Sequence, residues 1–340
     1  MTSAEAGGAM NESLALVAPG RPMLDYLPVG LFGWVMGVTG LSVAWRLAHV
    51  HYGAPEEIAL AIAVVAGVAF VLMVAGYGIK LVTAFAAVRE EFRNPITGNL
   101  FGTVPISLLQ LPIVVEPFAH HLAQIMWMAG AAGMVSFAWL IVTRWMTDRR
   151  QAAPPTPAWI IPVGGILNVP LALPTLGLPH LHGLMVAALA IGLFFTVPLF
   201  TLVFSRLVFE SPLPPALKPS LLILVAPFAV GYSTYTVTAG GTDLFAEALF
   251  MLTLFLLAVL LGQLRHLPVC CPFHVSWWSV SFPLAACSVA ALRFAAAKPG
   301  VMADTIAQAL LTLATWVIAG LLVGTLVDMG KGGLPDGCGG

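Results

Sequence analysis

Charged residues are scarce in this chain of 340 residues: they make up 9% of it, with 14 Lys and Arg and 15 Asp and Glu. Soluble domains carry about 25% charged residues. So few charges cannot cover a globule of this size, so a soluble enzyme is excluded. The net charge of −1 and the apolar composition exclude a nucleic-acid-binding protein and a disordered chain. The long continuous apolar runs exclude a β-barrel, whose strands alternate apolar and polar residues.

Patterns that carry catalysis or hold metals are also scarce. No G-x-S-x-G, H-E-x-x-H or P-loop pattern occurs, and residues 231–235 (G-Y-S-T-Y) lack the closing Gly of a nucleophile elbow. The eight His lie at the predicted ends of apolar segments or in loops, so no two can hold a haem inside a bundle. We therefore expect no enzyme activity, no cofactor and no metal. Metal binding or pH sensing by the outer His pairs (His49 and His51, His120 and His121, His180 and His182), and soft-ion capture by Cys270 and Cys271, remain alternatives.

Apolar residues, by contrast, make up 59% of the chain, and the mean hydropathy is +0.97. A membrane-spanning helix needs about 20 mostly apolar residues. Ten segments meet this length: 28–49, 57–79, 97–117, 119–143, 158–178, 181–205, 216–239, 243–264, 273–295 and 303–328. The composition thus predicts an all-α polytopic membrane protein, with a transmembrane domain over 27–329 between tails at 1–26 and 330–340. The first tail lacks a signal-peptide pattern.

The basic residues are divided unevenly between the two sides of these ten segments. Eleven fall on one side, and only Arg46, Arg293 and Lys298 fall on the other. Because Lys and Arg accumulate in cytoplasmic loops, this bias predicts an even number of spans with both termini in the cytoplasm. We expect a multi-pass protein of a bacterial inner (plasma) membrane.

Helix-breaking residues are numerous, with 26 Pro and 33 Gly. Proline at depth is tolerated where the freed backbone groups are buried in protein or face a water-filled cavity. The odd-numbered segments contain Pro105, Pro112, Pro162, Pro170, Pro174, Pro227 and Pro283, whereas the even-numbered segments contain only Pro198 at depth. This alternation predicts five helical hairpins, with odd helices inside and even helices facing lipid. Alternatively, Gly and Pro are simply common in transmembrane helices.

Polar residues at mid-depth are almost all neutral: Gln110, Asn168, Ser233, Thr234, Tyr235, Thr236, Ser279 and Ser281. Ion-coupled carriers usually need a buried carboxylate or an oxygen cage, so this pattern favours passive conduction. Hydroxyl groups and broken-helix N-termini suit anions and bind them weakly, as conduction requires. Any single hydroxyl can instead bond back to its own helix.

Four segments carry motifs of a known family. Residues 28–45 read P-V-G-L-F-G-W-V-M-G-V-T-G-L-S-V-A-W, and residues 94–96 and 104–106 read N-P-I and V-P-I. Residues 226–235 begin A-P and end S-T-Y, and residues 277–283 read W-W-S-V-S-F-P. In order and position, these resemble the tellurite-resistance/C4-dicarboxylate transporter family, which includes the plant guard-cell slow anion channels. The resemblance covers nearly all of residues 25–330. The chain differs from the family pattern at Asn94, where the family has His. It also has short tails, so we do not expect control by kinases.

The resemblance implies ten helices in five hairpins around a central pore lined by the odd-numbered helices, assembled as a homotrimer in the lipid bilayer. It also implies a phenylalanine plug, and the matching residue is Phe282. A ring across a narrow pore closes it by dewetting. We expect the pore to be lined or kinked by Gly33, Gly37, Pro105, Asn168, Pro170, Pro227, Ser233, Ser281 and Pro283.

Three functions are compatible with these features. The first is a gated channel for small inorganic anions such as chloride or nitrate. The second is a secondary transporter or exporter of an oxyanion or C4-dicarboxylate such as tellurite, sulfite or malate. The third, an enzyme or redox protein in the membrane, is disfavoured by the missing nucleophile and the peripheral His.

Overall fold

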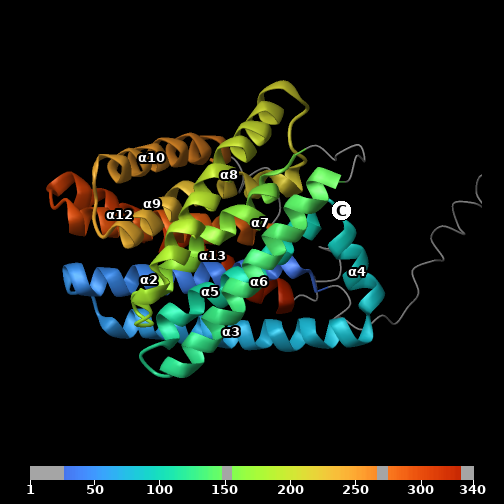
Figure 1. Cartoon of the computed structure of the whole chain (residues 1–340), viewed down its shortest axis with the longest axis horizontal. Helices are drawn as coiled ribbons and strands as arrows, with labels where there is room; N and C mark the ends of the chain where they lie inside the picture. The colour runs from blue at the N-terminus through green and yellow to red at the C-terminus, as the bar shows by residue number, and fades with distance from the viewer. Residues whose placement is uncertain (1–26, 148–154, 266–274, 331–340) are drawn as a thin grey trace, which may run out of the picture.

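The computed structural model describes residues 27–147, 155–265 and 275–330, and all regular elements within these ranges are helical (Figure 1). Nine helical segments of the described residues are long and apolar enough to cross a membrane. They are Val29–Tyr52, Glu56–Thr83, Thr97–Val115, His120–Thr147, His182–Phe209, Pro215–Ala239, Leu244–Leu264, Ser276–Ala297 and Val301–Asp328. Their ends lie within four residues of the predicted segments. The protein is therefore polytopic, as predicted.

The fifth predicted segment differs from the other nine. In place of a span over 158–178, the structure has a shorter apolar helix, Pro157–Ala172. The predicted boundary is wrong because the helix ends before Pro174, and residues 173–177 form a turn. The two predicted tails, 1–26 and the part of 330–340 beyond residue 330, lie outside the described residues.

Each inner segment combines a 3-10 helix with an α-helix. Four of them are simple pairs: η2 (Val29–Leu31) with α2 (Phe32–Tyr52), η3 (Thr97–Gly102) with α5 (Thr103–Val115), η7 (Pro215–Leu224) with α9 (Ala226–Ala239), and η8 (Val275–Val280) with α12 (Ser281–Ala297). The third inner segment in chain order has three parts: η4 (Pro157–Ile160), α7 (Ile161–Gly164) and a further 3-10 helix, η5 (Gly165–Ala172). A 3-10 helix therefore precedes the α-helix in all five.

Each outer helix is a single α-helix: α3 (Glu56–Thr83), α6 (His120–Thr147), α8 (His182–Phe209), α10 (Leu244–Leu264) and α13 (Val301–Gly330). Two short elements join them to the inner set, α4 (Phe85–Arg93) and η6 (Pro179–Leu181). The helices α3, α6 and α8 run four residues past their predicted ends, so Lys80, Arg144 and Arg206 lie in last turns rather than in loops. Basic side chains there complement the helix dipole.

Burial alternates along the chain as the prolines predicted. The four long inner segments are 61–78% buried, whereas the five outer helices are only 22–33% buried. The inner segments form a closed ring, in which α2 packs on α5, α5 on η5, η5 on α9, α9 on α12 and α12 on α2. Each inner segment also packs on the outer helix that follows it in the chain, so the molecule consists of five hairpins (Figure 1).

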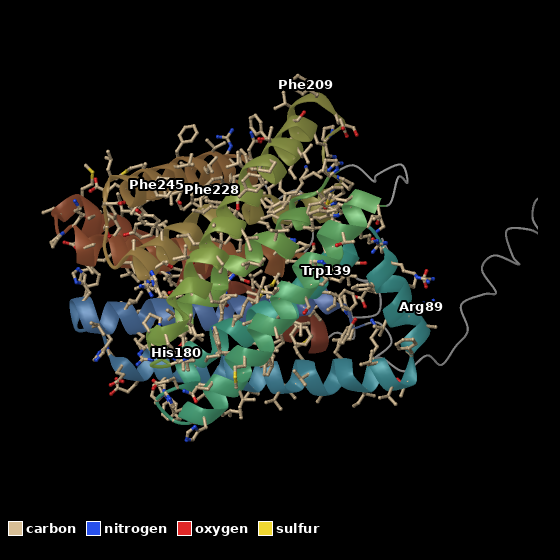
Figure 2. The ribbon with its side chains drawn as sticks, in the orientation of Figure 1. Arg89, Trp139, His180, Phe209, Phe228 and Phe245 are labelled. Atoms are coloured by element: carbon tan, nitrogen blue, oxygen red, sulfur yellow. The ribbon has the colours of Figure 1, made fainter. Side chains whose placement is uncertain are left out.

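Large apolar side chains cover the outer helices. Trp139 on α6 is 70% exposed and Phe209 at the end of α8 is 83% exposed. Figure 2 shows Trp139, Phe209 and Phe245 on three different outer helices. Such a surface is unfavourable in water and suits the hydrocarbon of a bilayer.

Candidate functional site

The ring of inner segments encloses a cavity of about 300 Å³, which we call the entry cavity. All five inner segments contribute to it through their N-terminal parts, from Pro28 before η2 to Phe282 in α12. Its lining is mostly apolar and none of the described residues that line it is ionisable. Its polar groups include the hydroxyls of Thr97, Thr103, Thr156, Ser220 and Ser279.

A second cavity of about 40 Å³ lies further along the same ring. The same five segments line it with residues nearer their C-terminal ends, including Gly40, Gln110, Leu171, Ser233 and Val289. All five inner segments therefore run in the same direction, with their N-termini at the entry cavity. We call this second space the inner cavity.

Three side chains line both cavities: Asn168 of η5, Val230 of α9 and Phe282 of α12. They come from three adjacent members of the ring and mark the boundary between the two cavities. Phe282 is the second residue of α12, directly after the change from 3-10 to α-helix.

The structure brings six of the ten predicted site residues to these cavities. Gly33, Pro227 and Pro283 line the entry cavity, and Ser233 lines the inner one. Phe282 and Asn168 line both.

The other four predicted residues line neither cavity. Gly37 faces Ser281, whose hydroxyl donates to Trp278 O at 2.7 Å and Gly33 O at 3.3 Å, so this pair joins α2 to α12. Pro105 lies in the first turn of α5, and Pro170 lies inside η5; both are buried. These residues shape the ring without facing its interior.

Hydrogen bonds hold η5 in place on either side of Asn168. Leu167 O accepts from the Thr234 hydroxyl at 2.5 Å, and Val169 O accepts from Trp127 Nε1 at 2.9 Å. Pro170 has no N–H, so the 3-10 hydrogen bond that would end on Leu167 O is missing, and the Thr234 hydroxyl supplies a donor there. Asn168 is therefore fixed at the boundary between the cavities.

Most mid-depth hydroxyls bond to their own helix, as the alternative interpretation proposed. Ser233 donates to Ala229 O at 3.2 Å and Thr236 donates to Ser233 O at 2.9 Å. Thr156, beside the entry cavity, differs because its buried hydroxyl oxygen has no hydrogen-bond partner.

Sequence reasoning missed several lining residues. Trp278 is 1% exposed, lines the entry cavity, stacks on Trp34 with ring centroids 5.6 Å apart, and donates to the Thr325 hydroxyl at 2.9 Å. Val230 was missed because an apolar residue in an apolar helix carries no signal of its own. Trp278 was missed because, in the motif at residues 277–283, the family resemblance implied a role for Phe282 alone.

None of the ionisable side chains among the described residues lines either cavity. At the C-terminal ends of the inner segments, His51 Nε2 lies 3.5 Å from Asp304 Oδ1, and Lys298 Nζ lies 2.6 Å from Glu247 Oε1. Asp243 caps α10 and accepts from the Tyr235 hydroxyl at 2.5 Å, which lowers the pKa of that carboxyl.

No group of three metal-ligating side chains occurs among the described residues. Cys270 and Cys271 lie outside them. The outer His pairs are placed at segment ends, where His120 Nδ1 lies 3.2 Å from Glu116 Oε1.

At the opposite end, a buried ionic cluster joins α3, α4 and the start of η2. Lys80 Nζ donates to Glu91 Oε2 at 2.9 Å and to Leu27 O at 2.7 Å. Glu91 also accepts from Val29 N at 2.6 Å and from the Tyr77 hydroxyl at 3.1 Å. This cluster, which we call the entry clamp, lies beside Pro28 and Gly30 of the entry cavity.

Comparison with protein families gives one match that covers most of the chain. The SLAC1 family model, described as a voltage-dependent anion channel, matches residues 26–326. This range includes all the residues that line the two cavities.

Individual relatives include plant and bacterial proteins. The S-type anion channel SLAH3 of Arabidopsis thaliana is 27% identical over 322 residues, covering 90% of this chain and 49% of that protein. The guard cell S-type anion channel SLAC1 of the same plant is 24% identical over 318 residues, covering 90% of this chain and 56% of that protein. The tellurite resistance protein TehA homolog of Haemophilus influenzae is 25% identical over 274 residues, covering 79% of this chain and 81% of that protein. The chain spans about half the length of the plant relatives.

Proposed function

This chain belongs to the SLAC1 family of voltage-dependent anion channels, and from that membership we propose that it is a gated channel for small anions such as chloride or nitrate. It is a polytopic membrane protein of a channel family and not an enzyme. In the proposed mechanism the two cavities are parts of one pore, and the Phe282 ring is its plug.

The position of Phe282 between the two cavities is the observation that carries this proposal. An aromatic ring across a narrow apolar passage excludes water, so an ion cannot cross with its hydration shell. Rotation of that ring joins the cavities. Gly33, which also lines the entry cavity, has no side chain to obstruct such a rotation.

The direction of the five inner segments supports anions as the permeant species. Their N-termini converge on the entry cavity, and helix N-termini carry partial positive charge and free N–H groups. No described residue that lines either cavity is ionisable, so the path binds anions weakly and releases them readily.

The proposed channel crosses the membrane ten times. The fifth crossing is the segment Pro157–Ala172, which has twelve 3-10 residues and four α-helical residues. With rises of about 2.0 Å and about 1.5 Å per residue, it extends over about 30 Å, which matches the hydrocarbon thickness of a bilayer. Ten crossings fit the one-sided distribution of Lys and Arg, with both termini in the cytoplasm of a bacterial inner membrane.

Recordings from planar bilayers test the plug directly. We expect Phe282→Ala to raise the anion current at least about tenfold, which corresponds to removing about 1.4 kcal/mol from the barrier. The matched control is Phe294→Leu on the same helix. Phe294 stacks on Phe250 with centroids 4.2 Å apart and lines neither cavity, so its replacement leaves the current at the wild-type level.

The second candidate is a secondary exporter of an oxyanion or dicarboxylate, favoured by the name of the tellurite resistance relative. Transport assays in proteoliposomes distinguish the channel from the exporter. If the Phe282→Ala variant carries no current and the proteoliposomes show proton-coupled uptake of tellurite, sulfite or malate, the channel proposal is overturned. Currents that ignore the proton gradient would overturn the exporter.

We further propose that the protein assembles in the lipid bilayer as a homotrimer with one pore in each subunit. This rests on the family resemblance. Native mass spectrometry from detergent tests it, and a monomer that still conducts would contradict it.

A further inference from the structure

A pair of buried amides lies beside Phe282 at the boundary of the two cavities. Gln110 of α5 and Asn168 of η5 are 5% and 2% exposed, and both line the inner cavity. We propose that this amide pair is an anion-binding subsite, which replaces part of the hydration shell of the passing ion and sets the preference among anions. The inference rests on the proposed channel function.

The hydrogen bonds of the pair leave two donors free for a ligand. Asn168 Nδ2 donates to Gly165 O at 3.1 Å, and Gln110 Nε2 donates to Asn168 Oδ1 at 3.0 Å. A backbone carbonyl only accepts, so this chain of bonds fixes which end of each amide is nitrogen. Each NH₂ group has a second hydrogen that these bonds do not use.

An unpartnered atom in the same pair also indicates a ligand. Gln110 Oε1 is buried and has no hydrogen-bond partner. A buried carbonyl oxygen without a donor is costly, and a water that accompanies an anion supplies the missing donor. The amide pair thus offers N–H groups to the ion and a carbonyl oxygen to one retained water.

The inner cavity is much smaller than the entry cavity, about 40 Å³ against about 300 Å³. An ion that moves from the larger space into the smaller one keeps fewer of its waters, and the lining must replace the lost water contacts. The amide nitrogens are the side-chain N–H donors among the described residues that line this cavity.

The pair is also held rigidly, as a site that discriminates between ions requires. The hydrogen bonds from Thr234 and Trp127 to the carbonyls on either side of Asn168 prevent η5 from moving away. A rigid pair of neutral donors binds an anion without trapping it. Chloride holds its water more strongly than nitrate does, so chloride depends more on the replacement donors.

Permeability ratios in the Phe282→Ala background test the subsite. We expect Gln110→Leu to raise the permeability of nitrate relative to chloride by between about two- and tenfold, the change that corresponds to one net hydrogen bond. Gln110→Glu keeps the shape of the side chain but replaces the N–H donors with a negative charge, so it suppresses the anion current. The matched control is Ser107→Ala, one turn earlier on α5, where the hydroxyl bonds to Thr103 O and lines neither cavity.

The outcomes separate this inference from the channel proposal. Conduction by Gln110→Leu with the parental nitrate-to-chloride ratio overturns the subsite and leaves the channel intact. A folded but silent Phe282→Ala parent overturns the channel and the subsite with it. If Gln110→Leu does not conduct, the thermal stabilisation of the protein by chloride decides: its loss in Gln110→Leu and retention in Ser107→Ala support the subsite, and its retention in both overturns it.

Discussion

At the scale of single residues, Gly37 shows how closely the inner helices approach each other. A Cβ atom at Gly37 would collide with the side chain of Ser281 on α12. We expect Gly37→Ala to destabilise the protein by about 1–3 kcal/mol, the range for overpacked cores. Ser281→Gly removes the colliding atoms, so the double variant regains most of this loss in thermal unfolding followed by tryptophan fluorescence.

The control for this prediction is Gly67→Ala on the outer helix α3. A Cβ at Gly67 meets nothing within 4 Å, so this change is neutral or slightly stabilising in the same assay. Equal losses in Gly37→Ala and Gly67→Ala would mean that the contact with Ser281 is unimportant.

Gly37 also shows what a sequence cannot distinguish. A glycine on an inner helix is expected both where a pore needs space and where two helices touch, because both situations exclude a side chain. Gly33 lines the entry cavity, whereas Gly37, one turn later, lies against α12. The sequence predicted that Asn168 lies at mid-depth. It did not predict the hydrogen bond from Gln110 to Asn168, because the two residues are 58 positions apart in the chain.

At the scale of elements, proline stands in the first turn of the α-helix in every inner segment except the one that contains α2. Pro105 is the third residue of α5, Pro227 the second of α9 and Pro283 the third of α12. The missing N–H has no partner there in any helix, so the proline costs little. The preceding turns are 3-10, and this change of helix type at depth was not predictable from composition alone.

The entry clamp is the element-scale contact with the strongest predicted effect. Lys80 and Glu91 have side chains only 5% and 12% exposed, so removing one partner leaves a buried charge. We expect Glu91→Leu or Lys80→Met to cost about 3–5 kcal/mol each. The double variant loses much less than the sum of the two, as a double-mutant cycle of thermal unfolding would reveal.

A surface ion pair provides the comparison for the entry clamp. Lys298 and Glu247 lie 2.6 Å apart, but their side chains are 49% and 34% exposed. Glu247→Gln is therefore expected to cost less than about 1 kcal/mol, and added salt diminishes its effect. A loss in Glu91→Leu as small as that in Glu247→Gln would contradict the buried clamp.

At the scale of the whole molecule, scarcity of charge and the uneven proline count were enough to predict an inner set and an outer set of helices, whereas the closed ring was implied only by the family resemblance. Lipid requires apolar outer helices, and only an inner helix has neighbours that can pair the backbone groups freed by proline. The fifth segment, Pro157–Ala172, is the one whose predicted length was wrong. Its length in residues is that of a core helix, and the proposal that it crosses the membrane depends on the 3-10 rise, which the sequence does not reveal.

Orientation in the membrane is the prediction that involves the whole molecule. Glu57 and Glu90 are exposed and lie near opposite ends of α3, and Glu90 belongs to α4, which also carries Arg89 (Figure 2). The excess of Lys and Arg on the α4 side predicts that this side faces the cytoplasm.

In a chain whose cysteines other than the buried Cys287 are replaced by Ser, a membrane-impermeant maleimide added to intact cells should label Glu57→Cys but not Glu90→Cys. Permeabilised cells should label both. Labelling of Glu90→Cys alone in intact cells would reverse the orientation and place the entry cavity at the outer surface, so that anions would meet the helix N-termini from outside.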